Sequence, residues 1–454
     1  MNLFATFSGV ISSFGGLVRP IVSRFAVVIG CLSSSLVAGH ACGQYAHSLA
    51  ADINPGLETN ANYPYLTIYK SELYFTANGG TGIGHELYKH DGTAASLAVE
   101  IRPGSAHGVP DHMTVFDGSL YFSGNPGNPV SKELMRYDGT TVTLAADVAP
   151  SLFDSSAPFN LIVLNDELIF AANDGVHGSE LFRFDGTSAS LIEDLYPGAT
   201  SSHPNSLTVF DGELYFRADD GVHGSELFKY DGTSISLVKD IAPGPEGSDG
   251  ETVSTGVQAM GVYNDAIYFQ ARETGHDTEL YMYDGSAVTR AAEINIGSSG
   301  SSPTDFIVYE DELYFNAIQS SVGRELFKYD GTAVSLVSDI NPSGSSFPRD
   351  PAVFNGELFF AASDGSIGHE LFRFDGTSVK LAADINPFGS SSPRDLTVFN
   401  NQLYFQANDG GMYGVEIFRL RVVPEPATGV LTALCLFVMA VLANKRRFEI
   451  VHEQ

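Results

Sequence analysis

Carboxylates that recur beside glycines are the residues of this chain whose types and spacing could do chemistry. The segment Asp-Gly-x-x-Gly-x-Glu returns along the sequence and pairs Asp174 with Glu180, Asp220 with Glu226, Asp364 with Glu370, and Asp409 with Glu416. Paired oxygen donors around glycines could hold Ca²⁺. The alternative is that Asp-Gly makes a turn and the Glu ends a strand, which the lack of an EF-hand spacing favours. Calcium is the one cofactor that these residues suggest.

Two further sets of polar residues lie in the same loops. A recurrent acid ends a strand, where a cap for backbone N–H groups is its simplest role, at Asp52, Asp147, Asp194, Asp240, Asp339 and Asp384. Histidines also recur, but at different loop positions: His85, His177, His223, His276 and His369. Because their positions differ, we expect separate surface residues and not one shared ligand set.

The elements that position these residues belong to a repeat of about 46 residues. Its mark is Glu-Leu-aromatic followed by Asp-Gly-Thr, with copies starting at Glu86, Glu133, Glu180, Glu226, Glu279, Glu325, Glu370 and Glu416. Each unit holds four short apolar runs, and Asp-Gly lies between the first and second and between the third and fourth. Runs such as Leu-Tyr-Phe are apolar on consecutive residues, so both faces of each small sheet should be covered. This predicts an all-β, eight-bladed β-propeller of four-stranded antiparallel blades.

Closure of the ring is predicted from the last copy, which ends at Leu420 without a fourth strand. Residues 47–53 match the fourth strands of other copies, so we expect them to complete blade eight beside residues 416–420. The alternative is an open β-solenoid whose N-terminal strand caps one end. The two-to-three and interblade loops should share one face of the propeller, where a ligand site is expected. Blade five has a longer loop on that face, at 246–257.

The repeat resembles bacterial ELWxxDGT-repeat proteins from about Ala51 to Phe418. One departure is that the motif Trp is replaced in every copy, by Tyr88, Met135, Phe182, Phe228, Tyr281, Phe327, Phe372 and Phe418. The position stays large and apolar, which indicates core packing. The resemblance implies a secreted or surface repeat protein of propeller type and supplies no activity.

The two ends of the chain carry the patterns of export signals. Residues 1–43 contain an apolar stretch after Arg24 that is typical of a signal peptide, and the repeats occupy 47–420. Residues 421–426 include Pro424, Glu425 and Pro426, residues 427–443 are apolar enough for a transmembrane helix, and 444–454 form a basic cytoplasmic tail with Arg446 and Arg447. This order resembles a PEP-CTERM sorting signal, which implies an exosortase-type processing enzyme as a partner. An ordinary C-terminal membrane anchor is the alternative.

Charge restricts the partners. Five of the 24 Lys and Arg and three of the 54 Asp and Glu lie in 1–43 and 425–454, which leaves a body of net charge −32. Such a body repels phosphate backbones, so nucleic acid is an improbable partner, and a monomer is expected. The three cysteines do not suggest a disulfide framework.

Catalytic motifs such as GxSxG, HExxH and a Walker loop are missing from the sequence. Two carboxylates on opposite sides of the central channel could hydrolyse glycosides. In a body with so many acidic residues, however, some pair of carboxylates will lie close together by chance. The sequence thus favours an exported, non-catalytic module that binds or scaffolds extracellular polysaccharide or a surface protein. A secreted carbohydrate-active hydrolase or lyase on the same fold is the alternative.

Overall fold

The computed structural model describes residues 44–53, 59–60, 65–80, 82–127, 132–149, 155–244, 260–273, 276–297, 299–411 and 414–423. His47–Arg421 form one compact unit. Several predicted features lie outside the described residues: the signal peptide at 1–43, the insertion at 246–257, the sorting signal at Pro424, Glu425 and Pro426, the transmembrane helix at 427–443 and the basic tail at 444–454. Where the chain is described, no helix is long and apolar enough to cross a membrane.

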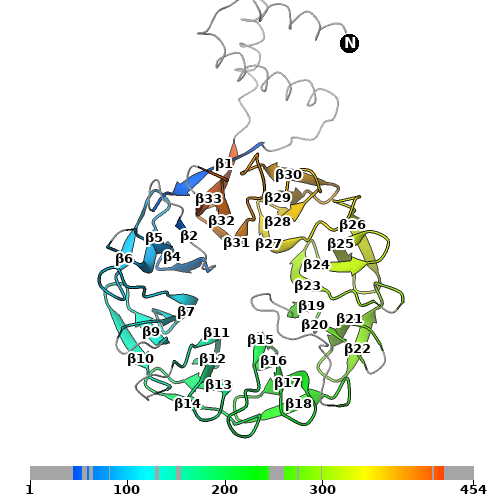
Figure 1. The fold of residues 1–454 in the computed structure, drawn as a ribbon. Coiled ribbons are helices and arrows are strands. Elements are labelled where there is room, and N and C mark those ends of the chain that lie inside the picture. The colour runs from blue at the N-terminus through cyan, green and yellow to red at the C-terminus, as the bar shows by residue number, and fades with distance from the viewer. Residues whose placement is uncertain are drawn as a thin grey trace, which may run out of the picture. The chain divides into compact units, whose positions relative to one another are not determined.

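Eight sheets are arranged in a ring, each with a four-stranded antiparallel path, and they confirm the eight-bladed propeller (Figure 1). The first strands of neighbouring blades contact one another around the centre of the ring, and we call this centre the channel. Blades one to four are β3 (Thr67–Tyr69), β4 (Glu72–Asn78), β5 (His85–His90) and β6 (Ala95–Val99); β7 (Asp111–Phe116), β8 (Ser119–Gly124), β9 (Glu133–Tyr137) and β10 (Val142–Ala146); β11 (Phe159–Leu164), β12 (Glu167–Asn173), β13 (Ser179–Phe184) and β14 (Ala189–Leu191); and β15 (Asn205–Phe210), β16 (Glu213–Asp219), β17 (Ser225–Tyr230) and β18 (Ile235–Lys239).

The remaining blades follow the same order. Blades five to seven are β19 (Met260–Tyr263), β20 (Ala266–Ala271), β21 (Glu279–Tyr283) and β22 (Val288–Ala292); β23 (Thr304–Tyr309), β24 (Glu312–Gln319), β25 (Gly323–Tyr329) and β26 (Val334–Ser338); and β27 (Arg349–Phe354), β28 (Glu357–Ser363), β29 (His369–Phe374) and β30 (Val379–Ala383). Blade eight is β31 (Arg394–Phe399), β32 (Gln402–Asn408), β33 (Gly414–Val423) and β1 (Gln44–Ala51).

The tight turns form where the sequence predicts them. Asp211 and Gly212 join β15 to β16 with φ of 48° and 77°, and two positive φ angles in a two-residue loop match the right-handed twist of a hairpin. In the second hairpin of the blade, the Asp231 carboxylate accepts the backbone N–H groups of Thr233 and Ser234 at 2.7 and 2.9 Å. The two hairpins therefore fix the strand order of a blade locally.

The core lies between adjacent blades. On β16, Leu214 and Phe216 are fully buried and Tyr215 is 2% exposed, which confirms that both faces of the sheet are covered. Phe228, at the position of the motif Trp, is also buried and stacks on Phe216 with ring centroids 6.2 Å apart. Ile169 of blade three joins the same cluster. The large apolar residues of the repeat thus serve packing, as predicted.

The seam in blade eight joins the two ends of the repeat region. β1 is the hydrogen-bonded neighbour of β33, and Arg419 Nε donates to Ser48 Oγ at 3.3 Å. Phe75 of blade one packs in one cluster with Phe399 of blade eight. These contacts confirm the predicted closure and exclude the open solenoid. A short strand, β2 (Thr59–Asn60), which was not predicted, pairs with β33 in parallel.

Candidate functional site: the acidic end of the channel

The Glu of each repeat is buried, and in blades one to seven it accepts hydrogen bonds from the loop that follows the blade. In blade three Glu180 is fully buried: Oε1 accepts the N–H of Ser202 at 2.8 Å, and Oε2 accepts the Ser202 hydroxyl at 2.6 Å and the Leu195 N–H at 3.2 Å. Glu325 and Glu370 hold the matching loops of blades six and seven in the same way. Burial raises the pKa of Glu180 to about 7, against the hydrogen bonds of Ser202 and Leu195. We call this arrangement the glutamate clasp; it ties a third strand to the loop that leaves its blade.

The Asp of each Asp-Gly-x-x-Gly-x-Glu segment accepts hydrogen bonds within its own turn. Asp174 Oδ1 accepts the N–H groups of Val176 and His177 at 2.9 and 2.8 Å, and Oδ2 lies 2.7 Å from His177 Nδ1. Asp220 and His223 repeat this pair in blade four, at 2.6 Å. Asp364 accepts the Ser366 N–H, and Asp409 accepts the Gly411 N–H.

The proposed calcium ligands are therefore engaged with their own loops or blades. Among the residues that the structure describes, no three carboxylate, imidazole or thiol groups are placed to hold a metal ion. Calcium binding by Asp174, Glu180, Asp220, Glu226, Asp364, Glu370, Asp409 and Glu416 stays a prediction.

The recurrent acid at the strand end caps its loop at Asp194, where Oδ2 accepts the Gly198 N–H at 3.1 Å. At Asp240 and Asp384 one carboxylate oxygen is buried without a hydrogen-bond partner among the described residues. The principal acceptor for these loops is thus the clasp glutamate, a role that the sequence interpretation missed. The Ser that follows five of these glutamates by 21 to 23 residues, as at Ser202 and Ser346, was the available signal.

The first strand of each blade lies beside the channel, and in six of the eight blades its pairing with the second strand shifts register near its start. In blades six, seven and eight the pairing register shifts just after the first residue, which leaves Asp305, Asp350 and Asp395 with φ of 58°, 52° and 52°. Asp tolerates this left-handed backbone better than most residues, because its short side chain can bond locally. Three successive blades therefore present an aspartate at the same position; we call them the Asp trio.

Hydrogen bonds link the trio around the channel. Asp305 Oδ1 accepts the backbone N–H of Asp350 at 3.3 Å, and its Oδ2 accepts from Asn316 Nδ2 at 2.5 Å. The backbone of Asp395 in turn bonds the Asp350 carboxylate, and that of Tyr65 bonds Asp395. Each carboxylate thus reaches the equivalent residue of the next blade, so their spacing is set by the blades themselves.

The environment of the trio favours protonated carboxyl groups. Burial, and then the charge of Asp350, raise the pKa of Asp395 to about 7 and that of Asp305 to about 6. Burial also raises the pKa of Asp350, but Arg349 and Arg394 oppose this rise. Carboxyl groups that exchange protons near neutral pH are suited to general acid and base catalysis.

Two atoms beside the trio lack partners. Asp395 Oδ2 and Arg349 Nε are both shielded from solvent, and neither has a hydrogen-bond partner among the described residues. A buried polar atom that is left unpaired costs free energy, so we expect a water molecule or a bound group to supply the missing hydrogen bonds here.

The other end of the channel is aliphatic. Near the one-to-two turn each first strand carries an exposed aliphatic side chain, between 37% and 44% exposed, at Ile68, Val115, Val163, Val209, Val262, Val308, Val353 and Val398. The channel is therefore polar toward the loop face and apolar toward the tight turns. The sequence predicts a site on the loop face, but its pattern alone does not identify the trio. Asp in place of the Ser206 or Asn160 of other blades was the signal for it.

Comparison with known proteins shows the fold alone. No family model and no curated protein matches the chain. The resemblance to ELWxxDGT-repeat proteins and to a PEP-CTERM signal thus stays a prediction.

Solved structures of similar fold include a puromycin-hydrolyzing peptidase of Mycobacterium tuberculosis, with 12% identity and a TM-score of 0.44 over 83% of this chain and 62% of that one. A structure described in a study of two prolyl endopeptidases shows 10% identity and a TM-score of 0.47, with 76% of this chain and 54% of that one covered. The β-propeller domain of the trilobed protease from Pyrococcus furiosus shows 11% identity and a TM-score of 0.42, with 71% and 98% covered. The chain thus spans only 62% and 54% of the length of the first two.

These neighbours correct the main expectation for function. The sequence favoured a non-catalytic module that binds or scaffolds polysaccharide or protein, whereas the similar structures are peptidases or parts of them. They agree better with the alternative, a hydrolase. At such identities and TM-scores the likeness concerns the propeller fold and assigns no reaction to this chain.

Proposed function

We propose that this propeller is a hydrolase that cleaves glycosidic bonds at the loop-face end of its channel. The observation that carries the proposal is the Asp trio, because three neighbouring blades hold Asp305, Asp350 and Asp395 at one position around the channel. Glycosidases use two carboxyl groups, one protonated and one ionised, on either side of the scissile bond. The unpartnered Asp395 Oδ2 supports a ligand contact at this point.

The roles follow from the surroundings of each carboxyl group. Asp395, whose pKa is raised to about 7, acts as the general acid and protonates the glycosidic oxygen of the leaving group. Burial raises the pKa of Asp350, but Arg349 and Arg394 oppose this rise, so we assign Asp350 as the base that takes the proton of the attacking water. The bond from the anomeric carbon to the leaving oxygen breaks as the bond to water forms. Asp305, bonded to the Asp350 backbone, positions Asp350.

The substrate class follows from charge and from the predicted export. A body of net charge −32 repels acidic glycans, so a neutral polysaccharide or oligosaccharide suits the channel better. Export, predicted from residues 1–43, would bring the protein to extracellular polysaccharide.

Release of sugar from neutral glycans by the purified full chain tests the proposal. Asp395→Asn and Asp350→Asn should each lower kcat/KM at least 100-fold, the usual contribution of a general acid or base. Asn160→Ser is the matched control, because Asn160 occupies the same left-handed position in blade three without an acid. If no neutral glycan is cleaved, or if the Asp variants cleave as well as the wild type does, the proposal is wrong.

A further inference from the structure

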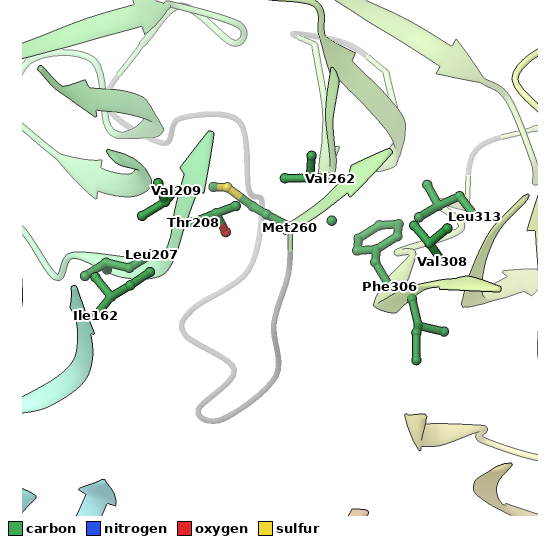
Figure 2. Close-up of a pocket in the computed structure, with 11 residues that line it drawn as sticks. Ile162, Leu207, Thr208, Val209, Met260, Val262, Phe306, Val308 and Leu313 are labelled. Atoms are coloured by element: carbon green, nitrogen blue, oxygen red, sulfur yellow. The ribbon is translucent and has the colours of Figure 1, made fainter. Parts of the chain in front are cut away.

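A second feature of the channel is an apolar pocket in the wall formed by blades three to six. It has a volume of about 300 Å³, and its lining comes mainly from the first strands β11, β15, β19 and β23. Figure 2 shows Leu207 and Phe306 on either side of Met260, with Ile162 and Val308 farther out. Thr208 supplies the one polar side chain of this lining. A concave apolar surface of this size is typical of small-ligand sites.

The pocket lies where the repeat is broken. Gly261 occupies a position that carries a side chain in the other seven blades, namely Thr67, Thr114, Ile162, Thr208, Ile307, Ala352 and Thr397. A Cβ atom at Gly261 would lie 2.5 Å from Phe306 Cβ, so only glycine allows this approach. Phe306 is itself a departure, since the equivalent residue is Leu, Met or Pro elsewhere, as at Leu207 and Leu396.

These two departures depend on each other and share one pocket. Packing alone does not require them, because seven other blades close their first strands without a glycine at this point. A site for a ligand would have to differ from the repeat. On the described first strands, Gly261, which has no side chain, meets the aromatic side chain of Phe306 at this pocket.

The pocket begins next to one member of the Asp trio. Asp305 immediately precedes Phe306 on β23, so the apolar lining starts one residue beyond an acidic side chain. A substrate that is bound at the trio and extends past Asp305 along β23 would therefore reach the pocket with one end. The lining has one hydroxyl and no charged side chain, so it offers few hydrogen bonds to a sugar ring.

We infer that the pocket binds an alkyl or aryl group attached to the sugar, so that the substrates are glycosides with an apolar aglycone. This inference rests on the proposed function and names its substrate class. The volume has room for one aryl ring with substituents or for a short alkyl chain, since a cavity of about 150 Å³ takes up benzene. Each methylene that enters the pocket should tighten binding about fourfold.

Calorimetric titration of the full chain with pentyl, hexyl, heptyl and octyl glucosides, below their micelle concentrations, tests the inference. In the wild type, Kd should fall about fourfold per methylene until the pocket is filled. Gly261→Thr places in blade five the residue that four other blades carry, and it should abolish this dependence on chain length. Ala352→Thr makes the same kind of change in blade seven and should leave the dependence intact.

A second pair of variants separates loss of the pocket from loss of folding. Leu207→Asn makes a pocket wall polar, whereas Leu396→Asn makes the equivalent change in blade eight, outside the pocket. Loss of the dependence in Leu207→Asn but not in Leu396→Asn supports the inference. The inference is wrong if the Kd of the wild type does not change with the length of the alkyl chain. It is also wrong if all four variants show the same dependence of Kd on chain length. Glycans without an aglycone test the trio separately, so a failure of the pocket would leave the proposed function standing.

Discussion

The glutamate clasp predicts a local loss of stability that can be measured loop by loop. In Glu180→Gln the side chain keeps its shape, but one acceptor oxygen becomes an NH₂ group. In the wild type, Oε1 accepts the N–H of Ser202 and Oε2 accepts the N–H of Leu195. The amide of Gln has only one oxygen, so in either orientation its NH₂ group faces one of these two N–H groups. A buried N–H without an acceptor costs about 1–3 kcal/mol.

That cost should appear as faster opening of the loop from blade three to blade four. At about 1.4 kcal/mol per factor of ten, hydrogen exchange in residues 195–202 should speed up about 5-fold to about 150-fold. Hydrogen–deuterium exchange followed by mass spectrometry measures this on the intact chain. The matched control is Glu193→Gln, because Glu193 is exposed in the same loop.

Glu325→Gln tests whether the clasp is local. It should speed exchange around Ser346 in blade six and leave the loop of blade three unchanged. If Glu180→Gln leaves the exchange of residues 195–202 at the wild-type rate, or if Glu193→Gln raises it equally, the clasp does not hold the loop.

Three further predictions concern calcium, pH and closure. If the Asp-Gly loops bind calcium, added calcium should raise the melting temperature and a chelator should lower it. The triple variant of Asp174, Asp220 and Asp364 to Asn should melt at the same temperature with calcium as with the chelator. A wild-type melting temperature that neither calcium nor the chelator changes would contradict calcium binding. The pKa of Asp395 is about 7 in the folded chain, and its ordinary value is 3.8. Between these two pH values the folded chain binds more protons than the unfolded chain does. The contribution of Asp395 to stability is therefore fully present below pH 3.8 and is lost as the pH rises through 7. Melting curves at pH 5 and pH 8 should therefore differ less in Asp395→Asn than in the exposed-turn control Asp211→Asn; equal differences would count against a raised pKa. Deleting residues 44–51 should leave β33 without its neighbour and lower the melting temperature, and an unchanged value would contradict the closure.

The repeat made most of the fold predictable. Asp211-Gly212 and Asp231-Gly232 specify hairpins by local backbone preference, and the consecutive Leu214, Tyr215 and Phe216 specify a sheet covered on both faces. The closure followed from counting strands, since only residues 47–53 could supply the missing one. These features depend on residues close in sequence or on the number of copies.

The candidate site was less predictable because it depends on neighbours from different blades. Asp305, Asp350 and Asp395 are about 45 residues apart in sequence, and only the ring brings them to one end of the channel. The register shift that turns each into the left-handed region is not visible in the hydrophobic pattern. The hydrogen bonds of Glu180 could not be predicted for a related reason: its partner Ser202 follows β14 in the sequence, and the sequence gives no measure of the burial of Glu180.

The seam between β1 and β33 means that the ring has no structural beginning. Both ends of the repeat region lie in one sheet, so a short peptide could join them, and the chain could instead be opened at another tight turn, such as Asp211-Gly212, with all eight sheets retained. Such a circular permutant would move the break to blade four. In the natural order, blade eight is the one blade held together by strands from opposite ends of the chain, so a pulling force on the two ends loads its ladder before any other.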